Sequence, residues 1–484
     1  MSQFSLPRRG RPEKPLIGEI KANWPLKLQV HMMMQRGLEN PLTITKEVSM
    51  SNENVSYRRG WIVALAGTGI NLALGILYTW SIFKGAITDS IAAGGAGAFN
   101  WDKASINDPY ATACLTFAFA MILAGRVQDK FGPRITAITG GLLTGLGFIL
   151  ISQTTNYWVW IAGFGVMAGM GIGFGYSAAT PPALKWFPPK KTGLIAGIVV
   201  AGFGLASVYI APLAQYLLEN FGLQQSMLFF GVGFTAIVSF FALFLKNPPE
   251  GYVADPAAAK AVVKVAAVAD KKPGEILKTA QFYVLWACFF IGAGAGLMVI
   301  GSATGLAKAS MGELAFLVVA IMAVGNAGGR IIAGVVSDKI GRANTLVIML
   351  VFQAVLMFLA IPVIDGVYTS AFAMPLLVTF MVFNYGTNLS LFPSFAKDLW
   401  GAKNFGMNYG ILFSAWGIGA FALVRVSEMM RVKSGGYTMS FAAAGVLLMV
   451  GAMLAGSLRA RRAEVPEVAP AFEAEELELQ KAVD

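Results

Sequence analysis

The sequence GRVQDKFGPR at residues 125–134 and the sequence GVVSDKIGR at residues 334–342 share one pattern. In both segments a glycine is followed, after three residues, by Asp-Lys and then by a second glycine with a basic residue close behind it. The aspartates of the two segments, Asp129 and Asp338, lie 209 residues apart. One such match alone is weak, but two at equivalent places indicate a chain built from two related halves.

Twelve apolar segments surround the two motifs, six in each half of the chain. Each has about 20 residues, enough to cross the hydrocarbon core of a bilayer. None shows the period-two alternation of the strands in membrane barrels. The first motif follows the second segment and the second motif follows the eighth. The predicted spans are 61–83, 109–127, 135–153, 157–180, 193–216, 224–245, 281–306, 314–336, 344–363, 371–393, 407–427 and 437–458.

The composition of the 484-residue chain is typical of a membrane protein. Apolar residues make up 56% and charged residues only 13%, and the mean hydropathy is +0.63. Soluble proteins carry about 25% charged residues, so a soluble enzyme, a disordered chain and a disulfide scaffold are excluded. The sequence predicts an all-α membrane protein with twelve transmembrane helices in two pseudo-symmetric six-helix bundles.

Side chains suited to metal or catalytic chemistry are scarce. The two cysteines, Cys114 and Cys288, fall inside apolar segments and are expected to be small core residues. The single histidine, His31, lies in the hydrophilic N-terminal region. The sequence therefore predicts no enzyme activity, no metal site and no cofactor.

The basic residues predict the orientation of the chain, because lysine and arginine collect in cytoplasmic loops. With both termini inside, the inside segments hold 30 of them, the outside loops hold six, and Arg330 belongs to neither. This predicts a multi-pass protein of the cell (inner) membrane with cytoplasmic termini. The net charge of +11 then faces anionic lipid, not nucleic acid. The six outside residues are Lys84, Lys103, Lys308, Arg425, Arg431 and Lys433.

Polar segments define the expected domain boundaries. Residues 1–49 contain no spanning segment and no signal or transit peptide. We interpret them as a mis-assigned start, with the natural chain beginning at Met50. The predicted parts are a cytoplasmic extension at 1–56, a six-helix bundle at 57–245, a cytoplasmic central loop at 246–280, a second six-helix bundle at 281–458 and an acidic cytoplasmic tail at 459–484.

We interpret the two motifs as a conformational latch at the cytoplasmic ends of the helices. Glycine lets neighbouring helices approach closely, aspartate can bridge to a helix terminus or a basic side chain, and the basic residues anchor the loop at anionic lipid. The alternative is a pair of ordinary positively charged cytoplasmic loops. The latch residues are Gly125, Asp129, Lys130, Arg134, Gly334, Asp338, Lys339 and Arg342.

Arg330 is the one ionisable residue deep inside a predicted span, about 12 Å along the helix from Asp338. A central arginine costs about 2.5–3.5 kcal/mol to insert, and no Asp or Glu lies within the spans to neutralise it. Because a guanidinium can bind a carboxylate through two hydrogen bonds, Arg330 is predicted to bind an anion in an aqueous cavity. The alternatives are an arginine bonded to carbonyls of neighbouring helices and one that extends to the interface.

Other polar and aromatic residues in the middle of the spans are candidates for the wall of that cavity. Asn326 lies one turn before Arg330, where it would orient the guanidinium or bind the substrate, and a structural role stays equally open. Membrane aromatics are more often packing or interface residues, and that alternative stays open for the others. The candidate substrate-binding residues are Arg330, Asn326, Tyr176, Trp80, Trp416 and Asn388, and Tyr78 and Asn384 are further mid-helix residues.

The duplicated motif resembles the signature of the major facilitator superfamily, which implies two halves that work by alternating access. Three segments resemble the oxalate:formate antiporter family, and monocarboxylate transporters are a more distant relation. The segments are GIGFGYSAATPPALKWFPPKKTGLIAGIVVAGFG at 171–204, NAGGRIIAGVVSDKIGR at 326–342 and NYGILFSAWGIGA at 408–420, within a similarity that covers 57–458.

The resemblance implies that Arg330 engages a substrate carboxylate in an aromatic-lined cavity, with Trp80 and Tyr176 at two aromatic positions. The oxalate and formate exchangers carry a second cation, a lysine in helix 11, where this chain has Trp416. Two cations suit a dianion, whereas one arginine beside an indole suits a monoanion with an apolar body. Helix 1 also lacks the lysine of the animal-type monocarboxylate transporters, so the coupling ion stays open.

These features predict a secondary active transporter of a small organic anion, with a monocarboxylate such as lactate, pyruvate, formate or acetate as its substrate. It would work by alternating access, as a proton symporter or an anion exchanger. One alternative is an oxalate/formate antiporter, and one from another class is a non-transporting membrane receptor or sensor on a transporter scaffold. The expected partners are the carboxylate, a proton or counter-anion and the bilayer, and the protein is expected to be monomeric.

Overall fold

Two compact units, Met1–Trp61 and Ile62–Asp484, make up the chain. The helix α2 (Pro41–Leu74) begins before Met50, and a natural start at Met50 stays a prediction. The predictions for residues 1–40, for the tail from residue 461 and for most of the central loop lie outside the described residues. The computed structural model describes residues 41–95, 97–188, 191–249, 252, 270–368, 370–401 and 404–460.

Every predicted span is helical in the structure, and the described residues contain no strand. The first half consists of α2 (Pro41–Leu74), η2 (Gly75–Thr79), α3 (Trp80–Ala93), η3 (Lys103–Ser105), α4 (Asp108–Ile151), α5 (Tyr157–Trp160), η4 (Ile161–Ala168), α6 (Gly169–Lys185) and α7 (Thr192–Ala242). The second half consists of α9 (Pro273–Ile276), α10 (Ala280–Ile300), α11 (Ala303–Met311), η6 (Gly312–Phe316), α12 (Leu317–Ile340), α13 (Arg342–Ile364), α14 (Ala373–Trp400), α15 (Phe405–Ser434) and α16 (Thr438–Ala460).

Ten helical segments in the described part of the chain are long and apolar enough to cross a membrane. One of them, Leu194–Ala242, contains two predicted spans, because Gly222 breaks α7 with a φ of 73°. The remaining predicted span lies in α14, which is less apolar because it carries Asn384 and Asn388. The prediction of an all-α fold with twelve membrane helices is confirmed.

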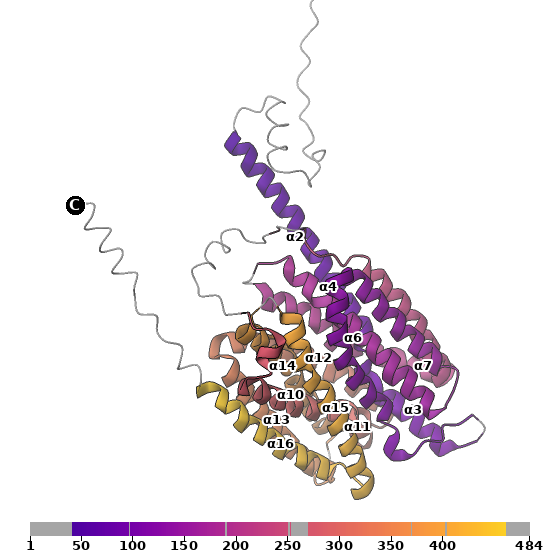
Figure 1. The fold of residues 1–484 in the computed structure, drawn as a ribbon. Coiled ribbons are helices and arrows are strands. Elements are labelled where there is room, and N and C mark those ends of the chain that lie inside the picture. The colour runs from indigo at the N-terminus through magenta and orange to yellow at the C-terminus, as the bar shows by residue number, and fades with distance from the viewer. Residues whose placement is uncertain are drawn as a thin grey trace, which may run out of the picture. The chain divides into compact units, whose positions relative to one another are not determined.

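The helices pack within each half and along two seams between the halves. In the first half α4 packs against α6 and α7, and in the second α12 packs against α14 and α13 against α16. The halves meet where α15 contacts α4 and where α12 contacts α7. Figure 1 shows the first half in indigo to magenta and the second half in salmon to yellow. The middle of α12 therefore lies at a boundary between the two halves.

Glycine permits the closest helix crossings in this fold. A Cβ atom at Gly171 of α6 would lie 2.6 Å from the carbonyl oxygen of Gly140 in α4. Real side chains do not come that close to backbone, so α4 and α6 can cross at this distance only without a side chain at that point.

Candidate functional site

Arg330 lies on α12 at the seam with α7, and it is only 1% exposed. Its Nε donates to Asn326 Oδ1 at 3.0 Å, and its Nη2 donates to the hydroxyl of Tyr78 at 3.2 Å. Its Nη1 donates to the carbonyl oxygen of Val200. Because Tyr78 and Val200 belong to the first half and Asn326 to the second, the guanidinium bridges the two halves.

A chain of hydrogen bonds continues from Tyr78. The hydroxyls of Tyr78 and Tyr385 are 2.7 Å apart, and Trp416 Nε1 donates to the hydroxyl of Tyr385 at 3.0 Å. Arginine and tryptophan side chains can only donate, so each hydroxyl accepts one hydrogen bond from them and one tyrosine donates to the other. The chain from Arg330 to Trp416 is buried throughout, and its geometry is therefore fixed by partners from both halves.

Aromatic rings surround this hydrogen-bonded chain. The centroid of the Phe203 ring lies 5.1 Å from that of Tyr78 and 5.4 Å from that of Tyr176. The centroid of the Phe117 ring lies 5.0 Å from that of Trp416 and 5.4 Å from that of Tyr176. All four pairs are edge-to-face contacts, which stabilise ring orientation beyond burial alone. Four of the six predicted residues, Tyr176 and Trp416 among them, thus share one site.

The other two predicted residues have different surroundings. Trp80 Nε1 donates to Asn107 Oδ1 at 2.9 Å. Asn388 Nδ2 donates to the carbonyl oxygen of Asn384 at 3.2 Å, within α14. Neither is among the described hydrogen-bonding partners of the guanidinium, so the structure does not bring them to it.

The guanidinium keeps unused hydrogen-bonding capacity. Of its five N–H groups, three donate to the described residues, and none of the acceptors is a carboxylate. The Nδ2 atom of Asn326 is also buried and has no hydrogen-bond partner in the described part of the chain. A buried cation and amide with spare donors can bind a small anion that offers several acceptor atoms.

Tyr385 and Val200 were not among the predicted residues. Val200 contributes a backbone carbonyl, which no side-chain pattern reveals. Tyr385 precedes Gly386, where a Cβ atom would lie 2.2 Å from the carbonyl oxygen of Asn326. This glycine lets α14 approach α12 and so places Tyr385 beside the site. A tyrosine next to a mid-helix glycine was the signal available in the sequence.

Arg330 is not the only buried charged residue in the described part of the chain. Glu428 and Asp108 are buried as well, with exposed fractions of 1% and 2%. The predicted spans ended at residue 427 and began at residue 109, so each missed its carboxylate by one position. Five basic residues assigned to outside loops also lie inside α-helices, namely Lys84, Lys308, Arg425, Arg431 and Lys433.

The second glycine of each motif forms a matching turn. Gly132 has φ 83° and ψ 169°, and Gly341 has φ 88° and ψ 151°, a conformation that glycine adopts without strain. The explanation predicted for the first glycine of each motif is wrong in this structure. Among the described residues, a Cβ atom at Gly125 or Gly334 would meet nothing within 4 Å, so no close helix approach explains the glycine there.

The basic residues of the motifs bind the ends of neighbouring helices. Arg342 forms ion pairs with Asp338 at 2.6 Å and with Asp398 of α14 at 3.1 Å. In the first half, Arg134 donates to the carbonyl oxygen of Leu243 at 2.6 Å, beyond the end of α7. Both contacts tie a motif to another helix of the same half. Of the other latch residues, Lys130 and Lys339 are exposed and the side chain of Asp129 lies outside the described residues.

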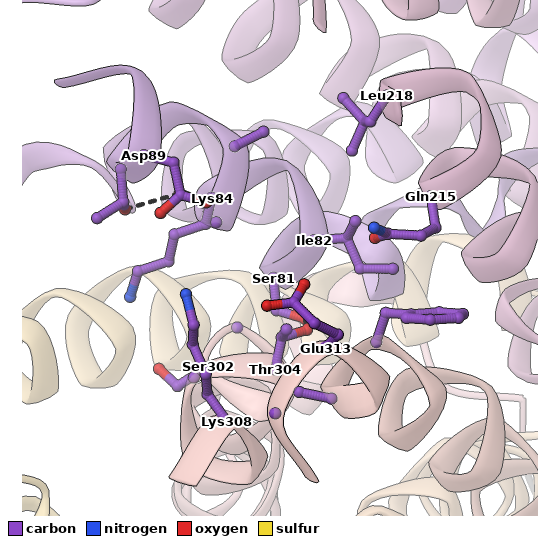
Figure 2. Close-up of a pocket in the computed structure, with 18 of the residues that line it drawn as sticks. Ser81, Ile82, Lys84, Asp89, Gln215, Leu218, Ser302, Thr304, Lys308 and Glu313 are labelled. Carbon is purple, nitrogen blue, oxygen red and sulfur yellow. Dashed lines mark hydrogen bonds between the residues drawn. The ribbon is translucent and has the colours of Figure 1, made fainter. Parts of the chain in front are cut away.

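A cavity of about 400 Å³ lies apart from Arg330, among residues of α3, α7, α11, η6 and α15. Its lining includes Lys84, Ser302, Lys308 and Glu313, whose side chains are drawn in Figure 2. Arg330 and its hydrogen-bonding partners do not line this cavity. The molecule therefore has a tightly packed polar site in its middle and a separate cavity.

The sequence matches the Major Facilitator Superfamily over residues 60–424 and again over residues 317–482. The chain belongs to this superfamily. It is 29% identical to the uncharacterized MFS-type transporter YhjX of Escherichia coli (strain K12) over 374 residues, which are 75% of this chain and 87% of that protein. The match and the apolar helices establish a multi-pass membrane transporter.

Similarity to carboxylate transporters and to a solved structure supports the same conclusion. The oxalate:formate antiporter of Oxalobacter formigenes is 28% identical over 362 residues, 74% of this chain and 81% of that protein. Human monocarboxylate transporter 11 is 25% identical over 408 residues, 82% of each protein. The crystal structure of a D-xylose-proton symporter has a TM-score of 0.59 at 14% identity and covers 82% of this chain and 97% of its own, which shows the fold alone. The predicted resemblance is confirmed.

Proposed function

We propose that this transporter carries a small monocarboxylate, such as lactate, pyruvate, formate or acetate, by secondary active transport with alternating access. The observation that carries the proposal is the buried guanidinium of Arg330, which contacts both halves and has no carboxylate among its described partners. A substrate held there would contact both halves at once, as alternating access around a fixed site requires.

The energy of a buried arginine supports an anionic substrate. Placing the guanidinium in mid-membrane costs about 2.5–3.5 kcal/mol on insertion scales. Neutral carbonyl and hydroxyl partners offset only part of that cost, because they carry no opposing charge. A carboxylate would supply the charge and accept two parallel hydrogen bonds from the guanidinium. Asn326, whose Nδ2 atom is buried and unpartnered among the described residues, would donate to the same anion.

The surroundings of Trp416 support a monoanion. Trp416 is 1% exposed, and its Nε1 hydrogen-bonds Tyr385, so the indole fills the space next to the hydrogen-bonded chain. Phe117 and Phe413 pack on the same indole, each with a centroid distance of 5.0 Å. An apolar wall with a single cation favours one carboxylate attached to a small apolar body. The named activity of the Oxalobacter relative keeps oxalate/formate exchange as the second candidate.

Orientation and coupling are part of the same proposal. The excess of lysine and arginine in the predicted inside segments supports cytoplasmic termini and an inner-membrane location. Proton symport and anion exchange both fit a site with one permanent cation. We also propose that the domains end where the sequence predicts and that the protein works as a monomer.

Uptake of radiolabelled lactate, formate and oxalate into proteoliposomes tests the proposal. Wild type and Arg330→Ala are compared with Lys433→Ala, which removes an exposed cation of α15 as a matched control. Each protein is assayed with a proton gradient and with unlabelled anion inside. We expect uptake of a monocarboxylate that Arg330→Ala abolishes and Lys433→Ala retains. Oxalate/formate exchange would support the second candidate, and no uptake of any carboxylate that depends on Arg330 would refute both.

A further inference from the structure

Glu428 lies near the end of α15 and joins the two halves of the protein. Its Oε2 accepts from Lys84 Nζ at 2.9 Å and from Asn107 Nδ2 at 3.1 Å. Its Oε1 accepts from Arg431 Nε at 2.8 Å. Lys84 and Asn107 belong to the first half, whereas Arg431 lies on α15 itself. The Oε2 atom of Glu428 therefore binds groups of the first half, and its Oε1 atom binds a group of the second half.

A second ion pair lies beside the first, and in it the first half supplies the acidic residue instead of the basic one. Asp108, which follows Asn107, pairs with Arg425 of α15 at 2.5 Å and accepts from the hydroxyl of Tyr157 at 2.7 Å. Arg425 and Glu428 are one helical turn apart. The first half thus supplies one cation and one anion, and α15 supplies their partners. We call the two pairs Lys84–Glu428 and Asp108–Arg425 the interhalf clamp.

Separation of the halves at this end would affect the two oxygens of Glu428 differently. Arg431 is three residues away on the same helix and would keep its ion pair with Oε1. Lys84 and Asn107 would lose Oε2, because they move with the first half. A cation and an amide would then point at the position that a carboxylate oxygen had occupied. A desolvated cation without a counter-charge is costly, so this pair of donors would recruit another anion.

Lys84 already lines the cavity of about 400 Å³ described above. Its side chain is 12% exposed, whereas that of Glu428 is 1% exposed. Figure 2 shows the Lys84 and Lys308 side chains on the same side of the cavity. Acidic residues line the cavity too, namely Asp89, Glu219 and Glu313. The lining therefore mixes basic and acidic side chains, and an anion held there would need specific donors.

We propose that Lys84 and Asn107 form a first carboxylate-binding site at the end of the helix bundle, which Glu428 occupies as an internal ligand while the halves are clamped. An incoming substrate carboxylate replaces Oε2 of Glu428 and weakens the clamp. The two halves then separate at this end, which opens a path to Arg330. This inference rests on the proposed function, which supplies the carboxylate ligand. It also rests on the proposed orientation, which places the clamp at the outer end of the protein.

The accessibility of a cysteine at the cavity tests the clamp without any need for transport. Ser302 lines the cavity and is 5% exposed, and the native Cys114 and Cys288 are buried. Ser302→Cys is labelled with a membrane-impermeant maleimide in oriented proteoliposomes, with and without lactate. We expect lactate to raise the labelling rate, and Glu428→Gln to raise it about tenfold without lactate, as expected when charge-assisted hydrogen bonds are lost.

Lys84→Gln separates anion binding from simple opening. It should remove the response of the cysteine to lactate and raise the KM for uptake from the outer side about tenfold, the effect of one lost charge-assisted hydrogen bond. Lys433→Gln is the matched control, and Lys84→Arg should restore most of the response even if Lys84→Gln folds poorly.

Two results would overturn the inference. One is a Lys84→Gln protein that still responds to lactate and has the wild-type KM on both sides. The other is a Glu428→Gln protein in which Ser302→Cys is labelled no faster than in wild type. The lactate response is also measured with Arg330→Ala in the background, where the first site should still bind. A lactate response in a wild-type background whose uptake does not depend on Arg330 would mean that the clamp inference holds and the proposed central site fails.

Discussion

Replacement of Arg330 by methionine separates a functional arginine from a structural one. Methionine has a similar length and no charge. The change removes three hydrogen bonds, to Asn326, Tyr78 and Val200. At the average of about 0.6 kcal/mol for such bonds in membranes, their loss costs about 2 kcal/mol. The same change recovers the insertion cost of the cation, about 2.5–3.5 kcal/mol. The net effect on the free energy of unfolding is a gain of about 0.5–1.5 kcal/mol.

Arg330→Met should therefore keep or slightly raise the midpoint of thermal unfolding while it abolishes carboxylate uptake. Tryptophan fluorescence during heating in detergent gives the midpoint, and proteoliposome uptake per folded molecule gives the activity. Arg425→Met is the control, because it leaves the buried carboxylate of Asp108 without its cation. It should lower the stability by about 1–3 kcal/mol, since Arg425 is itself partly exposed. A less stable Arg330→Met protein that still transports at the wild-type rate would show that the arginine is structural.

Three further changes test single contacts of the site and the motifs. Trp416→Lys adds a second cation and should create or greatly improve oxalate uptake; unchanged oxalate uptake would favour the oxalate/formate alternative. Tyr385→Phe removes the hydroxyl that hydrogen-bonds both Tyr78 and Trp416. The KM for uptake should rise about fivefold, as expected for the loss of one neutral hydrogen bond. An unchanged KM would exclude the hydroxyl from substrate binding. Gly341→Ala forces alanine to a φ of 88° and a ψ of 151°, a region that is essentially restricted to glycine, and should cost about 1–3 kcal/mol of stability. Gly334→Ala, with open space around its Cβ, should cost much less, and equal stabilities would refute the strain argument.

The fold followed from local properties of the chain. Length and apolarity of a segment decide whether it crosses a bilayer, and each of the twelve segments carries that information in itself. The equivalent positions of the two motifs then predicted the duplicated halves. The structure adds the physical reason for the second glycine of each motif, since Gly132 and Gly341 both have a positive φ with an extended ψ.

The central residue of the site was also visible in the sequence. Arg330 stood out because a charge in an apolar helix needs a compensating partner, and that argument uses only its own helix. Asn326 followed from its place one turn earlier. Trp80 and Asn388 were selected on residue type and depth alone, which do not say what they face, and their described contacts lie with Asn107 and Asn384.

The sequence by itself determined that this chain spans a membrane twelve times in two related halves and carries a buried arginine. Only the tertiary structure decided which groups meet that arginine, because Tyr78 and Val200 come from segments far from Arg330 in the chain. It also decided that Glu428 and Lys84, 344 residues apart, form an ion pair. Burial of a charge at the end of a helix depends on the neighbouring helices that cover it, and hydropathy along one segment does not contain that information.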